Sequence, residues 1–172
     1  DRADDWLREV IDGSAFPDLT AVGRTLADRG VTGVTDCTPY LTPDGPAAIA
    51  DAVRLGQLRQ RVVLTGHADL LEAPSIDGVE FGPVKIIVDE ADLPEFDHLT
   101  DTITRCHGAG RPVAIHLVTA ASTVFALAAW RAAGSQPGDR IEHGSVITTP
   151  VAELIAQLGL TVARAVSASV SR

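Results

Sequence analysis

Three polar side chains occur where aliphatic, strand-like segments leave little room for them. Lys85 stands in a Val-Lys-Ile run, His116 lies late in Ala-Ile-His-Leu, and His143 closes Arg-Ile-Glu-His. Burying a neutral polar group without a partner costs ~1–3 kcal/mol, and burying a charge costs more. Neutral imidazoles are good zinc ligands. We therefore predict a site formed by Lys85, His116 and His143, in which the two histidines are metal ligands.

The lysine is the most costly of the three to bury, and the sequence leaves its chemical state open. Its ammonium can pair with a carboxylate such as Asp89, which follows in the same run. Alternatively, burial can favour the neutral amine, which is a nucleophile. That amine can also react with carbon dioxide, and the resulting carbamate is a metal ligand. Finally, Lys85 can lie at the entrance of its strand with its ammonium in solvent, in which case it has no catalytic or ligand role.

The two histidines lie one strand-and-helix unit apart. The carboxyl ends of parallel strands in a barrel line one active-site mouth, so both imidazoles are expected to face the same space. Asp36, His67 and Asp89 follow or end other predicted strands and are candidates for supporting positions around the site. His98 and His107 are nine positions apart on one predicted helix. A separation of ~900° places them on opposite faces, and both are expected at the surface.

Short β-branched runs alternate with helix-like segments along the chain. The runs start on average about 26 residues apart, which is the length of a strand, a crossover helix and two loops. This alternation predicts an α/β fold with a parallel sheet and helices outside it. The expected strands are 31–37, 61–67, 83–89, 111–118, 139–146 and 160–166, and the expected helices are 17–29, 43–59, 93–109, 120–133 and one that opens at 148–150.

Two architectures satisfy this pattern, an open doubly wound sheet and a (β/α)8 TIM-type barrel. The chain contains neither the G-x-G-x-x-G turn of a dinucleotide fold nor a Walker loop, which favours the barrel. Eight units would need roughly 210 residues, so six leave the barrel two short. The chain also lacks methionine. We therefore expect residues 1–172 to form a single partial barrel of about six β/α units, the central piece of a longer protein.

The composition of the chain argues against some classes of binding partner. The formal net charge is −9, with 14 basic and 23 acidic residues, which argues against nucleic acid and against anionic membrane surfaces. Apolar residues make up 45% of the chain, enough for a buried core. Two cysteines are too few for a disulfide framework, and no leader or membrane-length apolar run is present, so we expect a cytoplasmic protein.

Four segments together resemble the amidohydrolase superfamily, particularly its branch of N-acyl and N-substituted amide hydrolases. They are Val-Lys-Ile at 84–86, Ala-Ile-His-Leu-Val-Thr at 114–119, Gly-Asp-Arg-Ile-Glu-His-Gly-Ser at 138–145 and Arg-Gly-Val-Thr-Gly-Val-Thr-Asp at 29–36. The resemblance covers roughly residues 20 to 162 and implies a metal-dependent barrel that hydrolyses non-peptide C–N (amide) bonds of small molecules with a metal-activated water. It also implies one or two divalent ions, zinc above all, bound by His116, His143 and Lys85. In the family, the counterpart of Lys85 is often carboxylated. The resemblance implies that the same three residues are the catalytic ones.

The sequence departs from the family pattern at both ends. The His-x-His pair of the family's first strand and the aspartate of its eighth strand are both absent. On its own, the chain is therefore expected to bind metal weakly and to have little hydrolase activity. A different class of function is an inactive α/β module that binds a partner or assembles into a homo-oligomer, because a partial barrel exposes sheet edges. A third is a Schiff-base lyase that uses Lys85 as its nucleophile.

Overall fold

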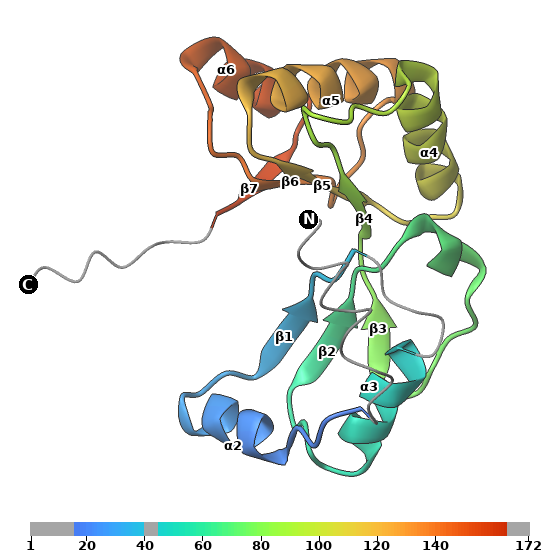
Figure 1. Ribbon diagram of the computed structural model, residues 1–172, viewed down its shortest axis with the longest axis vertical. Helices are drawn as coiled ribbons and strands as arrows, with labels where there is room; N and C mark the ends of the chain where they lie inside the picture. Colours follow the sequence, from blue (N-terminus) through green and yellow to red (C-terminus); the bar gives the residue numbers. More distant parts are fainter. Residues whose placement is uncertain (1–15, 40–44, 165–172) are drawn as a thin grey trace, which may run out of the picture.

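The computed structural model describes residues 16–39 and 45–164, in which parallel strands alternate with helices (Figure 1). This confirms the predicted α/β class. Every strand predicted from the sequence contains an observed one, and every predicted helix does as well. The strands are β1 Gly33–Asp36, β2 Arg61–Leu64, β3 Val79–Phe81, β4 Val84–Ile87, β5 Val113–Leu117, β6 Arg140–His143 and β7 Thr161–Ala163. The helices are α2 Thr20–Asp28, α3 Gly45–Arg54, α4 Phe96–Gly108, α5 Ala120–Ala133 and α6 Thr149–Gln157, with a short 3₁₀ helix, η1, at Ala68–Glu72.

The described strands form two parallel sheets, in the orders β1-β2-β3 and β4-β5-β6-β7. The extended segment that contains β3 and β4 pairs with β2 first and then changes to β5. Gly82 and Pro83 lie at the change, and a proline has no N–H to donate to a ladder. In the described residues, the hydrogen-bonded strand order therefore divides between β3 and β4. One backbone hydrogen bond across the division joins the Lys85 N–H to the Gly66 carbonyl oxygen at 2.8 Å.

The larger sheet has one apolar face and one polar face. Side chains alternate along each strand, so the residues that pair in register share a face. Helices α4, α5 and α6 cover one face and build the main core with Val84, Val113, Ile115, Leu117 and Ile141. On the opposite face, Ala114 pairs in register with Lys85 on one side and Arg140 on the other. His116 likewise pairs with Ile87 and with Glu142. This inner face is therefore where ionisable side chains gather.

The smaller sheet has a core of its own, formed by Ile49, Ala52, Leu58, Val62 and Leu64. Helix α2 approaches it closely at Gly23. A Cβ atom there would lie 2.0 Å from the Gln57 carbonyl oxygen, so only glycine fits. The two cores lie on either side of the division between the sheets.

Arg111 connects the two sheets at the point where the strand order divides. Its guanidinium donates to the carbonyl oxygens of Gly82 at 2.7 Å, Thr65 at 3.0 Å and Leu70 at 3.3 Å. The same group lies 5.5 Å from the centre of the Phe81 ring. Burial lowers the pKa of Arg111 from its ordinary value, which measures the cost of holding a charge here.

Asp139, immediately before β6, is the best-connected buried carboxylate in the described chain. It is fully buried and accepts hydrogen bonds from the Val113 N–H at 2.8 Å, the Gln136 N–H at 3.0 Å and the Trp130 indole at 3.1 Å. His107 Nε2 lies 3.1 Å from both of its oxygens. The expectation that His107 is a surface residue is therefore wrong, because α4 turns this side chain toward β6. His98, on the other side of the helix, is exposed as expected.

The two cysteines differ in environment. Cys37 is exposed, whereas Cys106 is buried in the main core, where burial raises the pKa of its thiol. Because the thiolate is the reactive form, we expect Ellman's reagent to modify Cys37 rapidly in the native chain and Cys106 only after unfolding. Counting released thiolate in native and urea-treated samples of wild type and Cys37→Ser tests this. Rapid native labelling of Cys37→Ser would contradict the burial of Cys106.

No helix in the described ranges is long and apolar enough to cross a membrane.

Candidate functional site

The structure brings the two predicted histidine ligands together. His116 lies on β5 and His143 ends β6, at the carboxyl ends of adjacent parallel strands. Their ring centroids are 4.4 Å apart, with the ring planes inclined by 73°. His116 is half-buried and His143 is exposed. Two imidazoles at this separation can donate nitrogen ligands to the same small volume.

The backbone of His143 explains how the rings meet. Strand alternation alone would place this side chain on the helix-covered face with Ile141, two residues earlier. His143 instead has φ of +72°, in the left-handed region, which few residues other than glycine enter. This turn at the strand end brings its ring against that of His116. It is the one positive-φ residue besides glycine in the part of the chain that the structure describes.

Electrostatics favour the neutral form of His116. Burial is the main cause that lowers its pKa below the ordinary histidine value, because a desolvated imidazolium is unfavourable. The neighbouring His143 and the Lys85 ammonium lower the pKa further, and the Asp89 carboxylate opposes them. A neutral imidazole keeps a lone pair for a metal ion, so this environment suits the predicted ligand role.

Lys85 lies on the same inner face and is only 5% exposed. Its amine is 3.9 Å from Glu142 Oε1, and the same oxygen accepts a hydrogen bond from Arg140 Nε at 2.8 Å. Burial lowers the pKa of Lys85, and the charge of Glu142 opposes that shift. Asp89, which the sequence suggested as the partner, instead accepts a hydrogen bond from the Ala91 N–H at 3.0 Å. The carboxylate that faces Lys85 is therefore Glu142.

Glu142 is the residue of this site that sequence reasoning missed. It is buried and pairs in register with His116 on the neighbouring strand, next to both histidines. The signal was present in the sequence, because a charged residue inside a strand run needs a charged partner. Choosing between Asp89 and Glu142 required the pairing of β5 with β6, which a single strand does not reveal.

The supporting candidates have separate surroundings. Asp36 ends β1, and its carboxylate accepts a hydrogen bond from the Thr38 N–H at 2.7 Å. His67 follows β2, and its Nδ1 lies 3.0 Å from an Asp69 carboxylate oxygen. Asp89 is exposed beyond β4, and its charge reaches His116. Of the three, Asp89 is therefore the one that the structure connects electrostatically to the histidine pair.

The donor set fits part of a metal site. Zinc in proteins commonly takes four ligands, three of them from protein at catalytic centres. Among residues 16–39 and 45–164, no group of three or more histidine, cysteine, aspartate and glutamate side chains is arranged to hold a metal ion. The two imidazoles fill two positions, and an ammonium at Lys85 is not a ligand. A complete site would need Lys85 as a carbamate or a donor from outside the described residues.

Known structures with the same fold include two proteins from Pyrococcus species. One is an uncharacterized metal-dependent hydrolase from Pyrococcus furiosus, with a TM-score of 0.76 and 20% identity over 95% of this chain. The other is an uncharacterized metal-dependent hydrolase from Pyrococcus horikoshii OT3, with a TM-score of 0.73 and 18% identity over 94% of this chain. The alignments cover 42% and 40% of those proteins, respectively.

No protein-family model matches the chain, and no curated protein matches it. Structural likeness at this level of identity establishes a shared fold, while function depends on the residues of the site. The chain thus has the α/β fold of a part, somewhat less than half, of two metal-dependent hydrolases.

Proposed function

We propose that this chain contributes the histidine ligands of a metal-dependent hydrolase. The observation that supports the proposal most directly is the His116–His143 pair, with ring centroids 4.4 Å apart at the ends of β5 and β6. The carboxyl ends of parallel strands are where this class of fold places its active sites. The two solved structures of like fold are also described as metal-dependent hydrolases.

Several residues of the chain have distinct roles in this proposal. A divalent ion, which we propose is zinc, would supply Lewis-acid polarisation of a carbonyl group and would acidify a water molecule. His116 and His143 offer it imidazole nitrogens, and burial lowers the pKa of His116, which favours the neutral form that can donate a lone pair. Arg140 fixes the Glu142 carboxylate at 2.8 Å, and Glu142 positions the Lys85 amine on the same face.

We also propose that the bond hydrolysed is a non-peptide C–N bond in a small amide. This finer step rests on the resemblance of the Val-Lys-Ile, Ala-Ile-His-Leu-Val-Thr and Gly-Asp-Arg-Ile-Glu-His-Gly-Ser segments to amide hydrolases. Carboxylation of Lys85 belongs to the same proposal. It would require the amine to leave Glu142, since a carbamate and a carboxylate repel each other.

Removing one imidazole tests the proposal. We expect the 172-residue chain to bind Zn²⁺ weakly and His116→Ala to bind it at least ~10-fold more weakly, because half of the nitrogen pair is lost. Isothermal titration with Zn²⁺ measures the affinity. The visible absorption of bound Co²⁺ reports nitrogen coordination.

His98→Ala is the matched control, because this histidine is exposed on α4 and is not part of the pair. Circular dichroism of each variant shows whether it is folded. If His116→Ala and His143→Ala both bind Zn²⁺ as tightly as His98→Ala does, the proposed ligand pair is wrong.

A further inference from the structure

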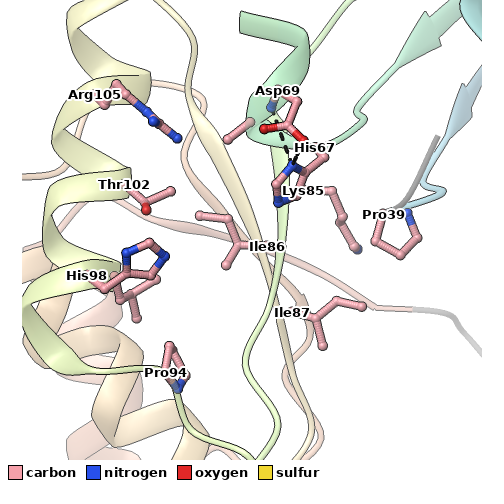
Figure 2. A pocket seen from close by; sticks show the side chains of 12 residues that line it. Pro39, His67, Asp69, Lys85, Ile86, Ile87, Pro94, His98, Thr102 and Arg105 are labelled. Carbon is pink, nitrogen blue, oxygen red and sulfur yellow. Dashed lines mark hydrogen bonds and ion pairs between the residues drawn. The ribbon is translucent and has the colours of Figure 1, made fainter. Parts of the chain in front are cut away.

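A pocket of about 350 Å³ lies between η1 and α4 (Figure 2). We call it the η1–α4 pocket. This volume is at the small end of the range for small-molecule sites, roughly 300–1,000 Å³. Its walls come from the end of β4, from η1 and from one side of α4, and neither His116 nor His143 lines it.

Three hydrogen-bond donors from α4 converge on the pocket. His98, Thr102 and Arg105 follow the spacing i, i+4 and i+7, which places them on one side of a helix. Figure 2 shows their side chains extending from the helix toward the pocket. Across the described residues, these three side chains make no hydrogen bond or ion pair with the protein. The donors are thus available to a ligand.

Among the charged groups that line the pocket, the one without an ion-pair partner in the described residues is a cation, Arg105. The lining includes the Arg105 guanidinium and one carboxylate, Asp69, which lies 3.0 Å from His67 Nδ1. Lys85 also lines the pocket, but its amine lies 3.9 Å from Glu142 Oε1. The chain as a whole has a formal net charge of −9. A guanidinium without an ion-pair partner in an acidic protein favours an anion over a cation at this place. A guanidinium binds a carboxylate through two parallel hydrogen bonds.

The rest of the lining is apolar. Ile86, Ile87 and Leu99 form the side of the pocket toward β4 and α4, and Pro94 closes its end near the start of α4. A fully hydrated inorganic anion would gain nothing from these contacts, whereas an apolar group would be removed from water. The lining therefore suits a molecule with a carboxylate at one end and an apolar body at the other.

We infer that the η1–α4 pocket binds a small organic carboxylate. Arg105 and Thr102 hold its carboxylate, while Ile86 and Leu99 contact its apolar body. Lys85 is the residue that this pocket and the proposed hydrolase site have in common. The inference does not rest on the proposed hydrolase function, because neither histidine lines the pocket and the pocket residues varied below lie on α4. A failure of zinc binding and a failure of carboxylate binding are therefore separate results.

Binding of 4-fluorobenzoate, followed by fluorine NMR of the probe, tests the inference. We expect saturable binding to the 172-residue chain and at least ~10-fold weaker binding to Arg105→Gln, which removes the charge-assisted hydrogen bonds. Thr102→Val, which keeps the shape but removes the hydroxyl donor, should also weaken binding. The neutral analogue 4-fluorobenzamide should bind at least ~10-fold more weakly than the acid.

Arg131→Gln is the matched control, because Arg131 is exposed near the end of α5, outside the pocket. It should bind 4-fluorobenzoate as wild type does. Arg105 is likewise exposed, so its loss should leave the fold intact, which circular dichroism checks. Three results would overturn the inference: no saturable binding to wild type, equal affinity for acid and amide, or equal weakening by Arg105→Gln and Arg131→Gln.

Discussion

Replacing Asp139 with alanine is expected to lower the free energy of unfolding by ~3–5 kcal/mol, because several buried groups lose their common acceptor. The Trp130 indole, the Val113 and Gln136 backbone N–H groups and His107 all bind this carboxylate. The carboxylate has no exposure to solvent, so the remaining donors would be stranded in the core. Urea unfolding followed by circular dichroism and tryptophan fluorescence measures the loss.

The substitution Asp139→Asn removes the charge of the side chain but keeps its shape, so it separates the two contributions to stability. An amide retains one acceptor oxygen but turns its NH₂ group toward a donor, so this isosteric change should also be strongly destabilising. Asp101→Ala on the exposed side of α4 is the control and should change stability by less than ~0.5 kcal/mol. If Asp139→Ala behaved like Asp101→Ala, the described network would not contribute to the stability of the fold.

Arg111→Met is expected to cost ~3 kcal/mol and to weaken the connection between the two sheets. Three backbone carbonyl oxygens, from Thr65, Leu70 and Gly82, would lose a charged donor. Methionine retains much of the apolar length of the side chain, so the cost reports the lost hydrogen bonds more than a cavity. Arg111→Lys should recover little, because an ammonium cannot match the fixed fork of a guanidinium.

The distinguishing result for Arg111→Met is the shape of the unfolding transition. Without the hydrogen bonds of Arg111, the two cores should unfold at different urea concentrations, so unfolding should no longer be two-state. Hydrogen exchange resolved by mass spectrometry can follow each core separately. The exposed Arg59→Met is the control. A single coincident transition with unchanged midpoint in Arg111→Met would show that the guanidinium does not couple the halves.

The local sequence pattern was sufficient to predict most helices and strands but not how the strands pair into sheets. Aliphatic runs bounded by turn residues located strands, and the span 120–133 expected for a helix is the observed span of α5, which ends before Gly134. Strand β3 is only three residues long and contains Glu80, so it has no apolar run to detect. The change of partner sheet at Gly82 and Pro83 depends on non-local pairing, which periodicity does not encode.

The candidate site shows the same limit. The position of two histidines at the ends of successive strands was enough to predict that they meet, and their rings do lie together. The pairing of Lys85 with Glu142 depends on how β4, β5 and β6 align in register. His107 was misplaced for a related reason, because its partner Asp139 comes from a segment 32 residues away. Contacts between distant segments decided each of these cases.

The left-handed backbone at His143 restricts how this position can vary. Glycine enters that conformation freely, asparagine, aspartate and histidine tolerate it, and β-branched residues are excluded by sterics. Of these tolerated types, only histidine carries an imidazole. Any exchange that relaxes the main chain therefore removes the ring that meets His116. The backbone preference for glycine and the need for a nitrogen donor thus act in opposite directions at this position, and no replacement satisfies both.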